Sequence, residues 1–212
     1  MNWQVHLRRN VSWDALEREQ TALISRARDF DEHHLLVSEP HPTFTQGRFS
    51  RTRDVLWNDE ELTNRGIGVA RVARGGQWTY HGPGQIVIYP IATLASLGFT
   101  RHAAYRFLAL LSTSLQTFLS DHGIPCEQRS RPFGLYAKER KLASFGMCFE
   151  GGVSSHGVAL YLTTQEEPFR GIHPCGCPGQ TPISLQDLGW QLDWPTTAVS
   201  LTDHIKKGFK RQ

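Results

Sequence analysis

Two stretches of the chain have the apolar spacing of an amphipathic helix. In the first, Ser12 precedes apolar side chains that recur at three- and four-residue intervals over residues 16–27, which places them on one helix face. The second covers residues 104–119 and is followed by Gly123 and Pro125, residue types that commonly follow a helix C-terminus. We expect both apolar faces to pack against the core.

Between and after these helices, short runs of β-branched or alternating apolar residues predict strands. Gly151 and Gly152 lie where a tight turn would join the last two strands into a hairpin. Short helical segments are expected over residues 184–188 and 202–209. Because the helices are few and lie outside a sheet-rich middle, the pattern predicts an α+β fold rather than regular βαβ alternation. The expected strands are residues 35–37, 68–72, 85–91, 135–137, 141–149 and 153–162.

The composition narrows the class of protein. No internal repeat, low-complexity run or flexible linker divides the 212 residues, so we interpret residues 1–212 as a single catalytic domain. The formal net charge of +3 is too small to indicate a nucleic-acid-binding protein, although it is compatible with an acidic protein partner. Residues 75–100 carry no formal charge but contain glycine, proline and histidine, so they do not predict a membrane helix.

The four cysteines indicate the compartment. Cys126, Cys148, Cys175 and Cys177 match neither a secreted disulfide framework nor the spacing of a structural zinc site. Free thiols in a reducing compartment are the better interpretation. The first nine residues also lack the basic-then-apolar order of a signal peptide. We therefore expect a cytoplasmic protein that binds no membrane.

A glycine-rich segment from Arg74 to Gln85, RGGQWTYHGPGQ, lies between two expected strands. Its four glycines leave backbone N–H groups open to a ligand, and Arg74, Thr79 and His81 add donors beside them. Such a loop suits a carbonyl or another anionic group. It is not a phosphate-binding P-loop, because no Lys-Ser/Thr pair opens a helix after it. A glycine-rich turn with solvated side chains is the alternative interpretation.

A second segment, PFRGIHPCGCPG over residues 168–179, contains two cysteines. Cys175 lies between proline and glycine on an expected loop, where a sulfur is more accessible than on a core strand. Cys177 is the rival nucleophile, whereas Cys148 has the apolar neighbours of a core residue. His173 and the two cysteines could be imagined as metal ligands, but the closing ligands at zinc-like spacing are missing, so we expect no metal site.

Two titratable residues lie on expected strands. A lysine at a strand start, such as Lys141, is commonly an exposed edge residue, and a functional role would require it to face the cysteine loop. His156 is followed by the small residues Gly157 and Ala159, which leave room along the strand for a long apolar ligand. The histidine itself is either a hydrogen-bonded structural residue or a catalytic one.

Taken together, the order and wording of these segments resemble the lipoyl(octanoyl) transferase family. The resemblance covers residues 35–188. It rests on EPHPTFTQG over residues 39–47, the run RGGxxTxHGPGQ over 74–85, GLYAKERK over 134–141, HGxAL over 156–160 and PCG over 174–176. The chain differs from the family pattern at Tyr161 and His173, where the family has asparagine, and at Cys177, where a non-thiol residue is common.

The resemblance implies a fold of the biotin/lipoate protein ligase type, with a mixed and largely antiparallel sheet and flanking helices. It implies transfer of an octanoyl group from acyl carrier protein to a lysine of lipoyl domains in 2-oxoacid dehydrogenases and the glycine cleavage H protein, without a cofactor. Cys175 would carry the acyl group, with Lys141 as its partner. The acyl site would be lined by Arg74, Gly75, Gly76, Gln77, Trp78, Thr79, Tyr80, His81, Ser144, Phe145, Gly146, Gly157, Val158 and Ala159.

These residue types suit the reaction. A cysteine allows exchange of one thioester for another, followed by downhill transfer to nitrogen, so that ATP is not needed. A lysine ammonium within about 4 to 6 Å of a thiol favours the thiolate. After acylation the lysine has lost its counter-ion and can act as base for the incoming amine. Backbone N–H groups near His81 and Gly82, or at Gly176, are our candidate donors to the oxyanion.

Three alternatives use other chemistry. An ATP-dependent lipoate or biotin ligase on the same scaffold would need no cysteine. A thiol hydrolase would use Cys175 with His81 or His156 and pass the acyl group to water. A binding module would form no acyl adduct at all.

Overall fold

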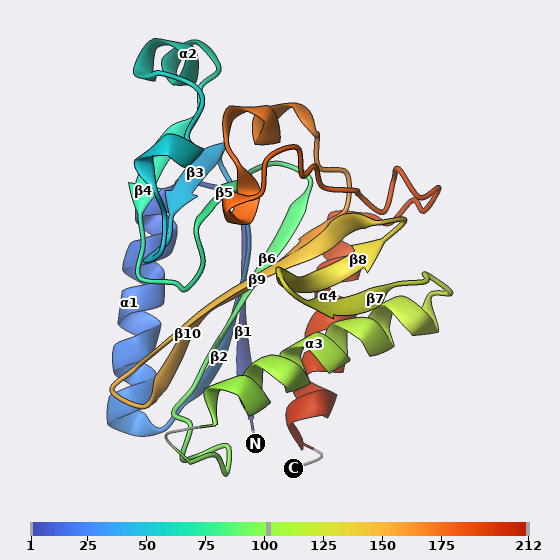
Figure 1. The fold of residues 1–212 in the computed structure, drawn as a ribbon. Helices are drawn as coiled ribbons and strands as arrows, with labels where there is room; N and C mark the ends of the chain where they lie inside the picture. Colours follow the sequence, from blue (N-terminus) through green and yellow to red (C-terminus); the bar gives the residue numbers. More distant parts are fainter. Residues whose placement is uncertain (1, 101–102, 211–212) are drawn as a thin grey trace.

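The computed structural model describes residues 2–100 and 103–210. Its centre is a seven-stranded sheet with the strand order β1-β2-β6-β10-β9-β8-β7 (Figure 1). Only β1 and β2 run parallel, and the other neighbours are antiparallel. In chain order the strands are β1 Trp3–Val11, β2 His33–Pro40, β6 Gln85–Ile91, β7 Glu127–Ser130, β8 Phe133–Ala137, β9 Arg140–Glu150 and β10 Val153–Tyr161.

A three-stranded sheet lies beside the large one. Its order is β4-β3-β5, with β3 Thr43–Gln46 parallel to β4 Gly68–Arg71 and antiparallel to β5 Trp78–His81. Short helical segments connect and follow these strands: α2 Asp59–Asn64 and the 3-10 turns η1 Thr52–Asp54, η2 Glu167–Gly171 and η3 Pro174–Gly176. The small sheet and the 3-10 turns form the upper part of the molecule in Figure 1.

Helices cover both faces of the large sheet. Helix α1, Trp13–Phe30, joins β1 to β2 and packs on β2, β6 and β10. Helices α3 Ala104–Asp121 and α4 Trp194–Lys210 pack against each other and belong to the core on the other face of the sheet (Figure 1). The side chains of β6 alternate accordingly: Ile86 and Ile88 join the core that contains α3 and α4, and Val87 and Tyr89 join the core that contains α1. This two-sided burial explains why β6 is apolar along its whole length.

The structure confirms the α+β class, the two amphipathic helices and all six expected strands, with shifts at their ends. Ser12 caps α1, since its side chain accepts a hydrogen bond from the Ala15 N–H at 3.3 Å. The β9–β10 hairpin also forms as expected, because Gly151 and Gly152 both have positive φ, which a tight turn requires. The C-terminal helix begins at Trp194, earlier than the expected residue 202.

One expectation was wrong. Residues 184–188 form a turn instead of a helix, closed by reciprocal bonds between Ser184 and Asp187 and ended by Gly189 at φ 91°. The N-terminal segment, for which no element was predicted, is a strand, so β1, α1 and β2 make one βαβ unit. Polar residues dominate β1 because it is the outer strand of the sheet. Within the described residues, no helix has the length and apolarity needed to cross a membrane.

Candidate active site

Lys141 and Cys175 meet although 34 positions separate them. The Lys141 Nζ lies 3.4 Å from the Cys175 Sγ and also donates to the carbonyl of Phe133 at 3.3 Å. Lys141 is the second residue of β9 and is buried, with 8% of its surface exposed, so it is not the exposed edge lysine that its position in the strand would favour. Because its Nζ lies beside the Cys175 sulfur, the ammonium is placed to stabilise a thiolate.

The backbone presents Cys175 at a sharp corner. Cys175 and Gly176 both adopt left-handed conformations, with φ of 57° and 69°. A Cβ at Gly176 would lie 2.2 Å from Oε1 of Gln77, and the positive φ at this position favours glycine. The loop is held from both sides, since the His173 N–H donates to the Asp54 carbonyl at 2.7 Å and the Ile183 N–H donates to the carbonyl of Lys141 at 2.9 Å. The corner therefore has a fixed position relative to β9.

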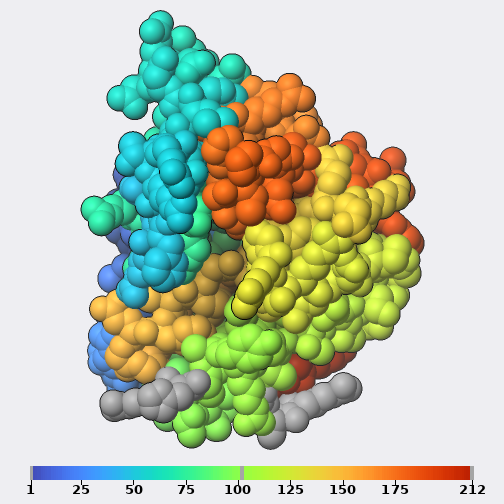
Figure 2. Space-filling view, viewed as in Figure 1, coloured from blue at the N-terminus to red at the C-terminus, as the bar shows by residue number. Residues whose placement is uncertain are grey.

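A largely apolar cavity opens beside this pair, at the junction of the two sheets. Counting the space that is open to solvent, it holds about 480 Å³. Figure 2 shows the hollow, bordered by the orange cysteine loop, the yellow residues of β8 and β9 and the blue-cyan residues near position 50. The lining residues are Arg74, Gly76, Gln77, Trp78, Thr79, His81, Val87, Tyr89, Lys141, Ser144, Phe145, Gly146, Gly157, Val158, Ala159 and Cys175.

This lining brings together both catalytic candidates and all but two of the residues expected around the acyl group. Gly75 and Tyr80 lie next to the cavity but do not line it. The Gly75 N–H donates to the carbonyl of Met147, and the Tyr80 ring packs edge-on against Phe169. Sequence reasoning missed Val87 and Tyr89, because β6 has the uniform apolarity of a core strand and only the register shows which side chains face the cavity.

Arg74 is a buried cation in the cavity wall. Its guanidinium donates to the carbonyl and hydroxyl of Thr45 at 2.7 Å and to the carbonyl of Gly75 at 3.0 Å, all of them uncharged acceptors. Burial lowers the pKa of Arg74 to about 10, so the group keeps its charge at neutral pH. A positive charge without a carboxylate partner in the described chain favours an anion in the cavity.

The two histidines considered as bases for a thiol hydrolase have other partners. His81 lines the cavity, stacks on Trp13 and shares a hydrogen bond with Gln85, and burial lowers its pKa to about 3. His156 faces a different hollow, between α1 and the β9–β10 hairpin, and burial lowers its pKa also to about 3. Neither ring forms a hydrogen bond with Cys175, and both are weak bases.

Three further polar groups at or near the site have partners within the fold. The Gly176 N–H, expected as a possible oxyanion donor, already donates to the carbonyl of His173 at 2.9 Å. Cys177 directs its sulfur to the carbonyl of Cys175, at 3.7 Å, and does not line the cavity. The Tyr161 hydroxyl lies 2.6 Å from the Ser144 hydroxyl, so this departure from the family pattern occupies space beside the cavity wall.

The fold and this site define a known class of protein. Residues 12–206 match the model of the lipoyl protein ligase A/B catalytic domain, and the chain belongs to this family. The resemblance noted from the sequence is thereby confirmed.

Two curated relatives make the comparison more specific. One is the octanoyltransferase of Pseudomonas syringae pv. tomato, with 33% identity over 197 residues, covering 93% of this chain and 84% of the relative. Another is the octanoyltransferase of Alkalilimnicola ehrlichii, with 36% identity over 193 residues, covering 91% of this chain and 84% of the relative.

Solved structures support the fold class. P. falciparum LipL1 in complex with lipoate superposes with a TM-score of 0.72 at 12% identity, covering 99% of this chain and 61% of that one. The biotin protein ligase from Aquifex aeolicus superposes with a TM-score of 0.54 at 12% identity, covering 99% of this chain and 69% of that one. The expected biotin/lipoate protein ligase type of fold is confirmed.

Proposed function

We propose that this protein is an octanoyltransferase of lipoate biosynthesis, which moves an octanoyl group from acyl carrier protein to a lipoyl-domain lysine through a thioester on Cys175. The observation that carries the proposal is the 3.4 Å contact between the Lys141 ammonium and the Cys175 sulfur at an apolar cavity. The named relatives support the same activity. The acceptors would be the lipoyl domains of 2-oxoacid dehydrogenases and the glycine cleavage H protein.

In the first half-reaction, the Cys175 thiolate attacks the carbonyl carbon of the octanoyl thioester. A new carbon–sulfur bond forms and the bond to the carrier's sulfur breaks. The departing sulfur takes a proton from the Lys141 ammonium, which is left as a neutral amine. The Lys141 ammonium stabilises the attacking thiolate, and the buried charge of Arg74 favours negative charge at the same place. This exchange conserves the thioester and so requires no ATP.

In the second half-reaction, the acceptor lysine attacks the acyl-enzyme. An ordinary lysine amine, with a pKa of about 10.4, is protonated at neutral pH and must lose a proton before it can attack. The first of its protons goes to solvent. Acylation has removed the negative charge beside Lys141 and left its side chain a neutral amine, which accepts the second proton from the attacking nitrogen. The amide bond forms, Cys175 leaves as a thiolate, and Lys141 is an ammonium again.

The cavity supplies the binding energy for the acyl chain. Val87, Val158 and Phe145 offer apolar surface, and Gly146, Gly157 and Ala159 leave room between them. Each buried methylene contributes about 0.8 kcal/mol, so the fit of the tail sets the chain-length preference. We propose the cytoplasm as the place of action because the nucleophilic thiol must stay reduced.

The structure offers less support for the rival reactions. An ATP-dependent ligase remains the nearest alternative, since the solved neighbours include lipoate and biotin ligases, but it gives no reason for the Lys141–Cys175 contact. A thiol hydrolase needs a histidine base, and His156 lies outside the cavity.

The test is intact mass spectrometry after incubation with octanoyl-carrier protein, without ATP, followed by peptide mapping. We expect one octanoyl group on Cys175, its transfer to an added lipoyl domain, no adduct on Cys175→Ser, and a normal adduct on the matched control Cys177→Ser. Full activity of Cys175→Ser that depends on ATP would establish the ligase. Loss of the adduct to water with no acylated lipoyl domain would establish the hydrolase.

A further inference from the structure

Exposed arginines lie on the loop that follows β3 and at the end of β4. We define the arginine rim as Phe49, Arg51, Arg53 and Arg71. Three hydrogen bonds fix the loop to the cavity-lining segment: the N–H of Arg48 to the Arg74 carbonyl at 3.1 Å, the N–H of Phe49 to the Gly76 carbonyl at 3.0 Å, and the Trp78 indole to the Arg51 carbonyl at 3.0 Å. The rim therefore has a fixed place beside the cavity.

The arginine side chains of the rim have no ionic partner within the described part of the chain. Arg51, Arg53 and Arg71 are exposed, and none of them forms a side-chain hydrogen bond or ion pair with the described residues. The adjacent Arg48 donates to the Cys148 sulfur at 3.5 Å and approaches Glu150 at 3.8 Å. The Arg48 and Glu150 side chains are both largely exposed, so their contact neutralises little charge. Asp54, the acidic residue of the same loop, is buried.

An exposed aromatic side chain lies on the same loop as Arg51 and Arg53. The Phe49 side chain is 69% exposed, although the rest of its loop is bonded to the body of the protein. Exposed apolar side chains commonly mark interaction sites when other residues of the same surface are complementary to a partner. Arginine and aromatic residues are also enriched among those that carry the binding energy of protein interfaces.

We infer that the arginine rim is the docking surface for the acidic body of the octanoyl-carrier protein. This inference rests on the proposed function. The donor's acyl chain must enter the cavity while its protein body stays outside, so that body must lie against the wall of the entrance. Figure 2 shows the residues near position 50 forming one wall of the hollow, opposite the residues of β8 and β9. Positive charge without partners on this wall complements a negatively charged carrier.

The experiment compares a carrier-bound donor with a small one. In the double variant Arg51→Glu/Arg53→Glu, we expect the KM for octanoyl-carrier protein to rise about tenfold, since attraction becomes repulsion at two positions. The KM for octanoyl-CoA, which lacks the carrier, should stay within about twofold. The matched control is Lys207→Glu/Lys210→Glu, which changes the net charge equally at two exposed residues near the end of α4 and should leave both values unchanged.

Three results would overturn the inference: an unchanged KM for the carrier donor, an equal rise for octanoyl-CoA, or a rise confined to the lipoyl-domain acceptor, which would assign the rim to the acceptor. In a second variant, Phe49→Ser, we expect the KM for octanoyl-carrier protein to rise and the KM for octanoyl-CoA to stay unchanged. Failure of the proposed function is separate, because the unmodified protein would then transfer no octanoyl group even from octanoyl-CoA.

Discussion

At the scale of single residues, His156 shows how burial sets a charge state. Its backbone N–H donates to Oε1 of Gln20 at 2.9 Å. Its ring packs edge-on against Tyr89, and the ring Nδ1 is buried without a hydrogen-bond partner among the described residues. Protonation would place a charge in this position. The lowered pKa means that the folded protein keeps the ring neutral where the unfolded chain protonates it.

This difference predicts a loss of stability in acid. A histidine with a folded-state pKa of about 3 and an unfolded value near 6.5 destabilises the fold as the pH falls below that unfolded value. The substitution His156→Asn removes the titration, and asparagine tolerates the positive φ of 55° at this position. Between about pH 7 and pH 5, we expect the free energy of unfolding to fall by about 2 kcal/mol less in the variant than in the unmodified protein.

Urea unfolding at the two pH values measures this difference. His41→Asn, at an exposed histidine, is the matched control. Its free energy of unfolding should fall between the two pH values by the same amount as that of the unmodified protein. An equal fall for His156→Asn would show that the ring is protonated in the fold. His81 is also buried with a low pKa, so part of the acid sensitivity should persist in the variant.

The residue scale also marks the limit of sequence reasoning. Cys175 and Lys141 were predicted from the family motif, but a motif contains no distances. The 3.4 Å contact between them depends on how the fold places β9 against the Pro174–Gly176 turn. The Gly176 N–H was predicted as a donor because glycine-rich loops expose their backbone, yet here a tight turn uses it. Local sequence cannot distinguish these two outcomes.

At the scale of elements, the approach of β10 to β6 depends on Gly157. A Cβ at this position would lie 2.0 Å from the Ile88 carbonyl oxygen and 2.9 Å from Cδ of Pro90. These neighbours belong to the centre of the large sheet and cannot move away independently. The absence of a side chain is therefore what allows the two strands to meet beside the cavity.

The substitution Gly157→Ala should separate the strands. We expect a loss of about 3 kcal/mol or more in the free energy of unfolding, together with loss of acyl transfer, because the overlap is with backbone. Chemical denaturation measures the first and the mass-spectrometric assay the second. Gly68→Ala is the matched control, since a Cβ in β4 would meet its nearest atoms at 3.8 Å. A variant at position 157 as stable as this control would contradict the predicted overlap.

Elements with strong local patterns were predicted well, and those defined by their neighbours were not. The six strands rich in apolar residues and the helices α1 and α3 were all expected. Strand β1, with Arg8 and Arg9 in its second half, and the short strands β3, β5 and β7 were missed, because they exist through pairing with other strands. The segment 184–188 has helical spacing but is too short, and Gly189 ends it.

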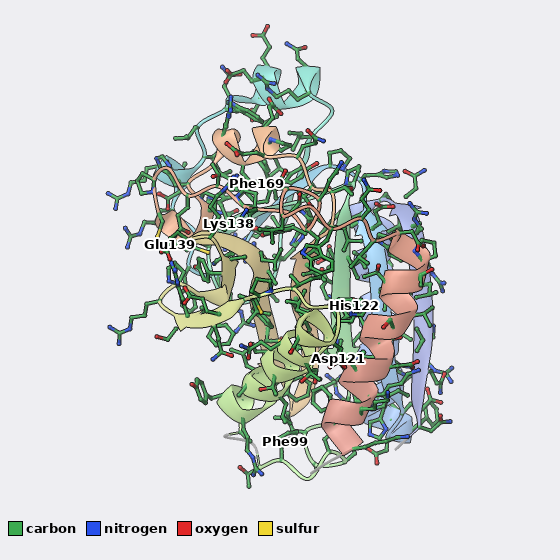
Figure 3. All side chains as sticks on the ribbon, turned by 90° about the vertical axis from the view of Figure 1, so that its right-hand side faces the viewer. Phe99, Asp121, His122, Lys138, Glu139 and Phe169 are labelled. Carbon is green, nitrogen blue, oxygen red and sulfur yellow. The ribbon has the colours of Figure 1, made fainter. Side chains whose placement is uncertain are left out.

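At the scale of the whole molecule, the site is assembled from distant segments. The small sheet supplies the glycine-rich segment, the large sheet supplies Lys141 and the small residues of β10, and a 3-10 turn supplies Cys175. Figure 3, from the side, shows α3 and α4 around Asp121 and His122, well separated from the Lys138–Glu139 turn that precedes β9. The helices thus support the sheet without entering the site.

The modest positive charge of the chain predicts a salt effect that depends on the donor. Attraction between exposed charges is screened by salt, with a Debye length of about 10 Å at 0.1 M. We expect kcat/KM for octanoyl-carrier protein to fall severalfold between about 0.05 and 0.5 M NaCl, and kcat/KM for octanoyl-CoA to fall less. Steady-state assays over this range provide the measurement. Indifference of the carrier reaction to salt would contradict an electrostatic encounter.

The division of labour around the cavity has an evolutionary consequence. Lys141 and Cys175, the groups that we propose to make and break bonds, lie together, whereas the other lining residues Gly146, Gly157 and Ala159 occupy little volume. In the proposed function, a single added methyl group at Ala159 would shorten the tail that is accepted without touching the reacting atoms. Single substitutions at these small residues would therefore let selection change the length of the transferred acyl chain, while the residues that carry out the transfer stay the same.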